Sequence, residues 1–215
     1  MTERTELPMR PMVLLGAGGH ARVLLALARA VGRPLIGVCD PGLQARGLAY
    51  WEGLTVLGGD EALNQYGPDE VDLLLGVGQM VRGKQRANLY ATLRATGYSF
   101  PPLVHPTAWL APDVTLADGV QVMAGAVVQP GCSLGPNTII NTRACLDHDC
   151  RIGADVHIAP GAVLCGGVEV GSSAFVGAGA VVIQCIKVGR GSIVGAGVTL
   201  RKDLASNETM SDHKK

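Results

Sequence analysis

Aliphatic residues recur every six positions through the second half of the chain. From Leu110 to Leu200, all sixteen positions in this register are leucine, isoleucine or valine. A helix repeats about every 3.6 residues and a half-buried strand every two, so neither explains this period. Glycine often follows three places later, where a corner needs a left-handed backbone: Gly119, Gly125, Gly131, Gly161, Gly167, Gly179, Gly191 and Gly197. The pattern predicts a repeat fold in which each hexad is a short strand and a turn.

Three hexads per coil would stack residues eighteen positions apart, with strands roughly 4.8 Å from one another along the axis. Sixteen hexads then give about five coils and a prism about 25 Å tall. Because aliphatic side chains fill the interior, any site must lie on an outer face, between the solenoid and another domain, or between subunits. A cyclic trimer is the closed arrangement that we expect.

The first hundred residues follow a different pattern. The segment "MVLLGAGGHARVLLALARAVG" predicts a strand, a glycine turn over residues 16–19 and a helix from about His20 to Ala30. A second strand, "PLIGVCD", ends at Asp40, and a third, "VDLLLGVG", ends at Gly78 before the helical segment "QMVRGKQRANLYATLRATG". These elements predict a small parallel sheet.

The glycine turn is a candidate ligand site. Gly16-x-Gly18-x-x-Ala21 approximates the dinucleotide fingerprint, and Asp40 stands where a ribose hydroxyl could be held. About ninety residues cannot house both halves of a dinucleotide fold. We therefore interpret the turn as a mononucleotide or sugar-nucleotide site, with NAD binding and simple turn packing as alternatives. Backbone amides at the start of the helix favour phosphate.

A proline-rich segment, "PPLVHPTAW", separates the two patterns. We expect a sugar-nucleotide-binding βαβ domain over residues 1–103, a β-helix over 104–204 and a flexible polar tail over 205–215. Three basic residues near the end of the first domain could reach a phosphate, although a solvated helix face is the preferred interpretation: Arg82, Lys84 and Arg86.

Composition excludes several classes of function. Lys plus Arg and Asp plus Glu each number 18, so the formal net charge is zero and a nucleic acid partner is not expected. No run of eighteen apolar residues and no signal-type segment is found, which favours a cytoplasmic protein without a membrane partner. The six cysteines lack metal-ligand spacing, so we expect buried thiols and no metal.

The cluster Asp147-His148-Asp149 interrupts a region of small and apolar residues. Imidazole titrates near neutral pH and suits a general base, and a carboxylate hydrogen-bonded to its other nitrogen would raise its pKa. Neighbours in a strand point to opposite sides, so only a corner lets either aspartate reach the ring, and both stay candidates. His157 is half a coil away, on the order of 15 Å across the prism, so the two histidines could share a substrate only between subunits.

Four segments carry a resemblance to a known family: "GAGGHARV", "GVGQMVRGKQR", "INTRACLDHDCRIG" and "VHIAPGAVLCGGVEVG". The chain resembles the hexapeptide-repeat sugar acetyltransferases of the sialic-acid O-acetyltransferase type. It is most similar to enzymes that N-acetylate nucleotide-linked 4-amino-4,6-dideoxy sugars, a group that includes perosamine N-acetyltransferase. The resemblance implies a small Rossmann-like α/β domain, a left-handed parallel β-helix, and a homotrimer with active sites between subunits.

The resemblance also implies roles for individual residues. His148 would be the general base and Asp149 its support, while His157 would contact the thioester end of acetyl-CoA and Asn141 would lie near the amino sugar. Backbone contacts to CoA would fall on Gly166, Ala178 and Ala196. Contacts to the nucleotide would fall on Gly18, Gly19, His20, Asp40, Pro41 and Gly78. The family's closing "G-x-P-A-K" segment is absent from "RKDLASNETMSDHKK", which leaves the contacts to the far end of CoA open.

The expected reaction is direct acetyl transfer. The 4-amino group of the sugar would attack the acetyl-CoA thioester while His148 removes the proton, in the synthesis of a surface glycan such as the lipopolysaccharide O-antigen. The main alternative is O-acetylation of a sialic-acid-like sugar. Less favoured hypotheses are a covalent acetyl-cysteine on Cys145 or Cys150, a metal hydratase, which needs three converging histidines, and a purely structural solenoid.

Overall fold

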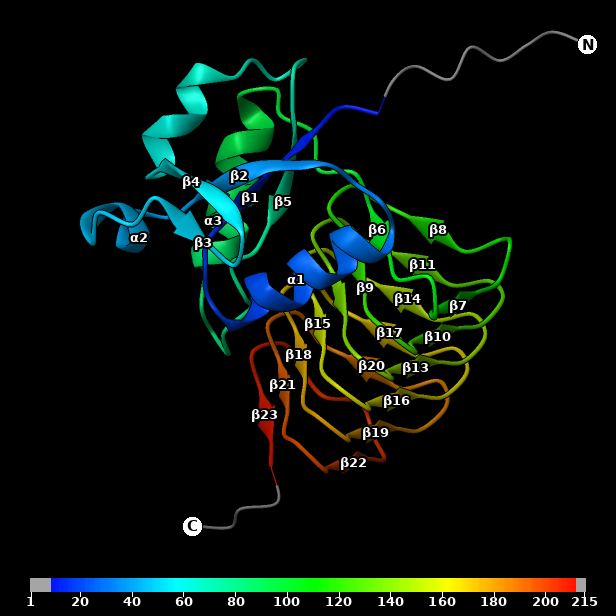
Figure 1. Cartoon of the computed structure of the whole chain (residues 1–215). Helices are drawn as coiled ribbons and strands as arrows, with labels where there is room; N and C mark the ends of the chain where they lie inside the picture. Colours follow the sequence, from blue (N-terminus) through cyan, green and yellow to red (C-terminus); the bar gives the residue numbers. More distant parts are fainter. Residues whose placement is uncertain (1–8, 212–215) are drawn as a thin grey trace, which may run out of the picture.

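The computed structural model describes residues 9–211. It consists of an N-terminal α/β domain seated against a three-sided parallel β-helix (Figure 1). The first eight residues of the predicted nucleotide-binding domain and the last four of the predicted tail lie outside the described residues.

The N-terminal domain is built on a five-stranded sheet in the order β3-β4-β2-β1-β5. Its strands are β1 (Met12–Leu15), β2 (Leu35–Cys39), β3 (Tyr50–Trp51), β4 (Leu54–Gly58) and β5 (Asp72–Leu75). The three predicted strands form the parallel centre as β1, β2 and β5. The sheet is mixed because β3 pairs antiparallel with β4 at the edge, a short hairpin that the sequence pattern missed.

Helices cover this sheet and attach it to the β-helix. They are α1 (Gly19–Ala30), α2 (Pro41–Ala45), the 3₁₀ helix η1 (Asp60–Gln65) and α3 (Gln85–Ala95). The apolar stripe of α1 includes Leu24 and Leu27, which are buried in one cluster with Met123 and Ile139 of the β-helix. Figure 1 shows α1 lying between the sheet and the β-helix. This continuous core fixes the two domains to each other.

The predicted helix from Gln79 begins late. Arg82 has a left-handed backbone with φ of 59°, and Gly83 donates its N–H to the Met80 carbonyl at 2.9 Å in a turn. Helix α3 therefore starts at Gln85, and residues 79–84 form a loop against the β-helix.

The β-helix has three flat faces, named here by their first strands. The β6 face contains β6 (Leu103–Val104), β9 (Gln121–Val122), β12 (Ile139–Ile140), β15 (His157–Ile158), β18 (Phe175–Val176), β21 (Ile193–Val194) and β23 (Thr209–Met210). The β7 face contains β7 (Trp109–Leu110), β10 (Val127–Val128), β13 (Cys145–Leu146), β16 (Val163–Leu164), β19 (Val181–Val182) and β22 (Thr199–Leu200). The β8 face contains β8 (Thr115–Leu116), β11 (Ser133–Leu134), β14 (Arg151–Ile152), β17 (Glu169–Val170) and β20 (Lys187–Val188).

The predicted register is confirmed. From β7 to β22, the second residue of each two-residue strand carries the hexad aliphatic inward, and residues eighteen apart are paired, as in Leu146 with Leu164. All eight glycines that were predicted at corners have φ between 65° and 75°. Seven further corners use the same left-handed backbone with φ of 56° to 64° and carry side chains: Asn137, Arg143, Asp149, Asp155, Ser173, Cys185 and Asn207.

The segment predicted as a flexible tail over 205–215 contains regular pairing in its described part. Residues 209–210 form β23, which pairs in parallel with β21, and Leu204 bridges to Val188. Both pairings join residues sixteen apart, because the last coil is two residues shorter than the others. This deletion shifts the hexad register, so counting by six beyond Leu200 meets polar residues.

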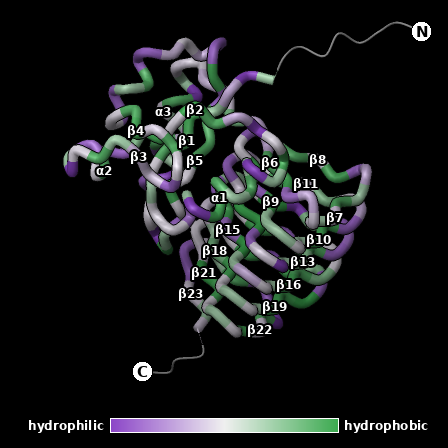
Figure 2. The backbone as a smooth tube through the Cα atoms, viewed as in Figure 1, coloured by the Kyte–Doolittle hydropathy of each residue, from purple (hydrophilic) through white to green (hydrophobic). Residues whose placement is uncertain are grey.

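The outer surfaces of the three faces differ. The N-terminal domain packs on the β6 face, and the outward side chains of the β8 face are polar: Thr115, Ser133, Arg151, Glu169 and Lys187. The β7 face is mostly apolar outward, with Trp109, Val127, Cys145, Val163, Val181 and Thr199. Figure 2 colours the backbone by the hydropathy of each residue, in the same view as Figure 1. A partly exposed apolar row on a regular face is typical of a subunit interface.

Candidate active site

His148 and Asp149 form a hydrogen-bonded pair at the corner between β13 and β14. The Nδ1–H of His148 donates to Oδ2 of Asp149 at 2.8 Å. Asp147 is engaged differently, because its Oδ1 accepts the backbone N–H of His148 at 2.8 Å. The φ of 61° at Asp149 turns its side chain back toward the ring, which a strand conformation would not allow. The structure therefore pairs the ring with Asp149 and leaves Asp147 as a backbone cap.

Two glycines leave space for this pair. A Cβ at Gly166 would lie 2.5 Å from Nε2 of His148, and a Cβ at Gly131 would collide with the Asp149 carboxylate. Gly166 was predicted as a CoA contact, whereas the role of Gly131 beside Asp149 had no signal in the sequence beyond its corner position. The imidazole and the carboxylate thus occupy room that only glycine provides.

The pair is open to solvent and chemically suited to proton removal. The side chain of His148 is 62% exposed, in a hollow lined by Cys165, Gln184 and Cys185. The hydrogen bond to Asp149, followed by the charge of Asp147, raises the pKa of His148. With the proton held on Nδ1, Nε2 carries a lone pair and can act as a base.

His157 lies elsewhere, on the β6 face under the N-terminal domain. Its Nε2 is 3.1 Å from Nδ2 of Asn141, whose Oδ1 accepts the Thr142 N–H at 2.8 Å. Asn141 must therefore donate, which puts the His157 proton on Nδ1, buried beside the Gln79 backbone. Its ring packs against Phe175 with centroids 5.0 Å apart. Burial lowers the pKa of His157 to about 4.

The structure does not bring His157 to His148 within one chain. His148 stands at the corner between the β7 and β8 faces, and His157 is in β15 on the β6 face. Asn141 follows β12 at the corner between the β6 and β7 faces. The contact of His157 with acetyl-CoA stays a prediction.

The predicted nucleotide-binding residues gather around a second hollow in the N-terminal domain. Its lining is Gly16, Ala17, Gly18, Gly19, His20, Asp40, Gly76, Val77, Gly78, Met80 and Gln85. Gly18 is the N-cap of α1, which has no side-chain cap and no acidic residue in its first turn. The free amides of this turn favour an anion.

The carboxylate of Asp40 accepts two backbone hydrogen bonds at the edge of this hollow. Its Oδ2 accepts the Ala17 N–H at 2.9 Å and its Oδ1 accepts the Leu43 N–H at 2.8 Å. The carboxylate thereby ties the glycine turn to the start of α2, which begins at Pro41. Of the predicted nucleotide contacts, Pro41 alone is not among the residues that line this hollow.

A buried polar network under this hollow was missed by sequence reasoning. Arg86, predicted on a solvated face, is 2% exposed and donates from Nη1 to the carbonyls of Leu75 at 2.8 Å and Val77 at 2.7 Å. Gln121 of the β-helix donates to the same Leu75 carbonyl at 3.0 Å and accepts from Nε2 of His20 at 2.8 Å. Burial and then the charge of Arg86 lower the pKa of His20 to about 4. The network fixes β5, which leads into Gly76–Gly78, against the β-helix.

The predicted CoA contacts lie on two corners that flank the β7 face. Ala178 and Ala196 are exposed and stacked at the corner with the β6 face, where the N–H of Gly197 donates to the Ala178 carbonyl at 2.9 Å. Gly166 is at the other corner, beside His148. One chain therefore does not gather all three, whereas two chains packed through their β7 faces would bring unlike corners together.

The covalent and metal-dependent mechanisms can be compared with this geometry. Cys150 is 0% exposed in the β-helix core, where a nucleophile is out of reach of a substrate. Within residues 9–211, no group of three His, Cys, Asp or Glu side chains is arranged to hold a metal ion. No helix in the described part of the chain is long and apolar enough to cross a membrane.

Comparison with family models gives two matches. Residues 11–93 match the PglD N-terminal domain, and residues 131–166 and 149–184 match the bacterial transferase hexapeptide (six repeats). Among curated proteins, none matches the chain.

Solved structures resemble nearly the whole chain. Perosamine N-acetyltransferase from Caulobacter crescentus, solved as a histidine-to-asparagine variant in complex with CoA and GDP-perosamine, is 36% identical with a TM-score of 0.85, over 93% of this chain and 92% of that one. The acetyltransferase domain of PglB from Neisseria gonorrhoeae FA1090, in complex with acetyl coenzyme A, is 35% identical with a TM-score of 0.86, over 93% and 95%. WeeI from Acinetobacter baumannii AYE, at 22% identity and a TM-score of 0.76, shares the fold. The predicted fold class, a small α/β domain followed by a left-handed parallel β-helix, is confirmed.

Proposed function

The chain belongs to the hexapeptide-repeat acetyltransferases with a PglD-type N-terminal domain, and from this premise we propose that it is an acetyl-CoA-dependent N-acetyltransferase of a nucleotide-linked amino sugar. The substrate class that we propose is a nucleotide-linked 4-amino-4,6-dideoxyhexose, like the GDP-perosamine bound by the Caulobacter enzyme. Its N-acetylated product would serve surface glycan synthesis.

The observation that carries this proposal is the His148–Asp149 pair. Its Nε2 is free of intramolecular hydrogen bonds among the described residues and faces an open hollow. We assign His148 as general base and Asp149 as the carboxylate that orients the ring and stabilises its protonated form. A base of this kind contributes about 10² to 10⁴ in rate.

The chemistry needs one proton removed and one returned. The sugar's neutral amine attacks the thioester carbonyl, which forms a C–N bond and a tetrahedral oxyanion. Nε2 of His148 takes the excess proton from the nitrogen, and the C–S bond breaks when the oxyanion collapses. The proton passes to the departing CoA thiolate, which leaves an amide, free CoA and neutral His148. No covalent enzyme intermediate is required, in agreement with the burial of Cys150.

The nucleotide would occupy the hollow around the glycine turn. The uncapped first turn of α1 supplies amides for the diphosphate, and Asp40 holds the turn that presents them. Residues 1–103 would thus form the sugar-nucleotide domain, and residues 104–204 the acetyl-transfer domain, to which Leu204 and β23 add a last partial coil.

We propose a homotrimer packed through the β7 faces. The apolar outward row that includes Val127, Val163 and Val181 favours burial between subunits. Such packing would set the corner of His148 against the Asn141, Ala178 and Ala196 corner of a neighbour. CoA and the amino sugar could then meet His148 between two subunits.

The test is His148→Asn, assayed with acetyl-CoA and a panel of GDP-, UDP- and dTDP-linked amino sugars by thiol release. We expect kcat to fall by about 10² to 10⁴, while His105→Asn, at a histidine in the first coil, keeps wild-type turnover. Near wild-type turnover of His148→Asn would remove the assignment. Hydroxylamine cleaves an O-acetyl ester but not an amide, so a labile product on a sialic-acid-like sugar would instead identify an O-acetyltransferase.

A further inference from the structure

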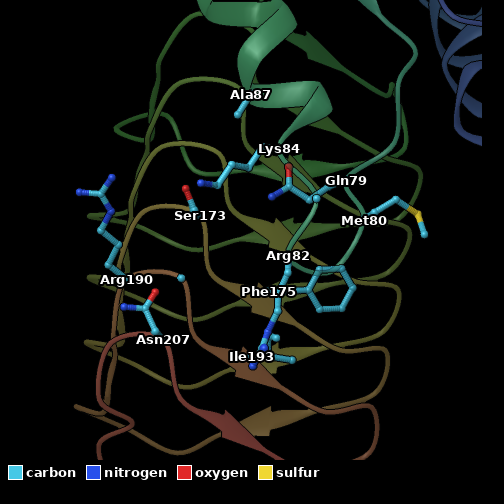
Figure 3. A pocket seen from close by; sticks show the side chains of 12 residues that line it. Gln79, Met80, Arg82, Lys84, Ala87, Ser173, Phe175, Arg190, Ile193 and Asn207 are labelled. Carbon is cyan, nitrogen blue, oxygen red and sulfur yellow. The ribbon is translucent and has the colours of Figure 1, made fainter.

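A cavity of about 280 Å³ lies outside both hollows described above, between the 79–84 loop and the β-helix. Its lining comes from this loop, from the start of α3 and from stacked coils of the β-helix, and includes Met80, Arg82, Lys84, Ser173, Phe175 and Arg190 (Figure 3). Ser173, Gly191 and Asn207 are stacked at the corner between the β8 and β6 faces, which is the corner opposite the β7 face. A trimer packed through the β7 faces would leave this corner outside.

The cavity is strongly cationic. Arg82, Lys84 and Arg190 line it, no carboxylate does, and none of the three forms an ion pair within residues 9–211. In Figure 3 the amine of Lys84 extends toward the hydroxyl of Ser173. Arg82 donates from Nη2 to the Thr209 hydroxyl at 3.1 Å, a contact that holds the guanidinium without neutralising it.

Two acidic side chains of this corner accept hydrogen bonds from neutral donors. Asp155, one coil above Ser173, accepts from Asn137 Nδ2 at 2.7 Å, and Glu208 accepts the Ala205 N–H at 3.1 Å. Three cationic side chains therefore border one cavity whose lining contains no carboxylate. Such a field attracts a multiply charged anion.

Helix α3 adds its positive end. Lys84 is the N-cap, no side chain caps the helix, and its first turn contains no acidic residue. Gly83, Lys84 and Ala87 of this helix start line the cavity, so the uncapped amides of the first turn lie at its edge. Cations, a hydroxyl and helix amides together are the donor set that binds phosphate in proteins.

The opposite side of the cavity is apolar. Phe175 and Ile193 from neighbouring strands and Met80 from the loop form it, and Figure 3 shows the Phe175 ring standing beside the Arg82 side chain. Phe175 is half-buried and held by the edge of the His157 ring, with an interplanar angle of 73°. A flat apolar group can stack on such a fixed ring.

We propose that this cavity binds an organic phosphate, with the phosphate on Arg82, Lys84 and Arg190 and the apolar part against Phe175. The site is separate from the hollows proposed for the nucleotide sugar and for acetyl transfer, and it does not depend on the proposed function. The loop over residues 79–84 also borders the glycine-turn hollow through Met80. Occupancy of the cavity therefore holds one wall of the substrate hollow against the β-helix.

The test measures binding by calorimetry, without acetyl transfer, using inorganic pyrophosphate and adenosine 5′-diphosphate as probes. We expect the Kd for both probes to rise about tenfold or more in Lys84→Glu and in Arg190→Glu. Arg151→Glu, at an exposed arginine on the β8 face, should stay within about twofold of wild type. Phe175→Leu should weaken the adenosine probe and leave pyrophosphate unchanged.

Thermal unfolding of each variant shows whether the charge reversal disturbs folding. Where it does, Lys84→Gln and Arg190→Gln replace the glutamate variants, because they remove the positive charge without reversing it. The proposal is overturned if the wild type binds neither probe at millimolar concentration. It is equally overturned if the cavity variants bind as the wild type does, or if Arg151→Glu weakens binding as much as they do. Failure of acetyl transfer in any variant or in the wild type would bear on the proposed function alone.

Discussion

Gly166→Ala offers a sharp test of how the imidazole is placed. The added Cβ would lie 2.5 Å from Nε2 and 2.6 Å from Cε1 of His148, where ordinary contact needs about 3.5 Å. The ring must therefore move by about 1 Å. Gly166 does not have a left-handed backbone and His148 is 62% exposed, so the ring can swing into solvent while the fold persists.

A displacement of about 1 Å costs on the order of 10² in rate, or about 2.7 kcal/mol of transition-state stabilisation. We expect kcat to fall by about this factor, KM for acetyl-CoA to change less than threefold, and the thermal midpoint to move by only a few degrees. Steady-state kinetics with thiol detection measures the first two quantities.

A double-mutant cycle with His148→Asn separates the two roles of Gly166. If Gly166→Ala acts through the imidazole, it adds little cost once the imidazole is gone. Should the full loss persist in the His148→Asn background, together with a raised KM for acetyl-CoA, Gly166 would act by contacting CoA and the reasoning from His148 would be refuted.

Three further predictions concern charge and assembly. Asp149→Asn removes the group that most raises the pKa of His148, so the acid limb of the profile of kcat/KM against pH should move to lower pH, and by more than in Asp147→Asn. An acid limb that stays in place or moves to higher pH would contradict the pairing of His148 with Asp149. Burial lowers the pKa of His157 to about 4, so between about pH 6.5 and 4 the unfolded chain binds one more proton than the folded chain, and the free energy of unfolding decreases by roughly 3 kcal/mol as the pH falls through this window. In urea unfolding, the slope of the free energy of unfolding against pH should be smaller by one proton in His157→Gln than in the wild type, and an unchanged slope would argue against burial of the ring. Val163→Asp should convert a trimer to monomers in light scattering, while Ser133→Asp on the β8 face should not; a Val163→Asp trimer would exclude the β7 face as the interface.

The solenoid could be predicted because its constraint is local and repeats. Each inward position must be aliphatic, and any slip would turn that side chain to solvent, so the register from Leu110 to Leu200 is visible in the sequence. The C-terminal end of the solenoid could not be predicted from the hexad count. The two-residue deletion before Leu204 breaks the count, although the backbone continues to pair through β23.

The candidate site was only partly predictable. His148 is conspicuous as a charged cluster in an apolar region, but the choice between Asp147 and Asp149 depends on the left-handed corner, which propensity does not specify. Arg86 looked solvated in the segment "RGKQR" because its burial depends on carbonyls of β5. Gln121, which joins His20 to Leu75, gives no pattern at all, since its partners come from another domain.

The left-handed corner at Asp149 has a consequence for engineering. The same corner one coil above and one coil below is occupied by Gly131 and Gly167, so the repeat tolerates glycine there. An L-residue in this conformation costs on the order of 1 kcal/mol. A library selected only for heat resistance would therefore drift toward glycine at position 149 and lose the carboxylate that raises the pKa of the proposed base His148. Variants of this enzyme selected for thermal stability should be assayed for turnover at each round, because thermal stability favours glycine at position 149 whereas the proposed activity needs aspartate there.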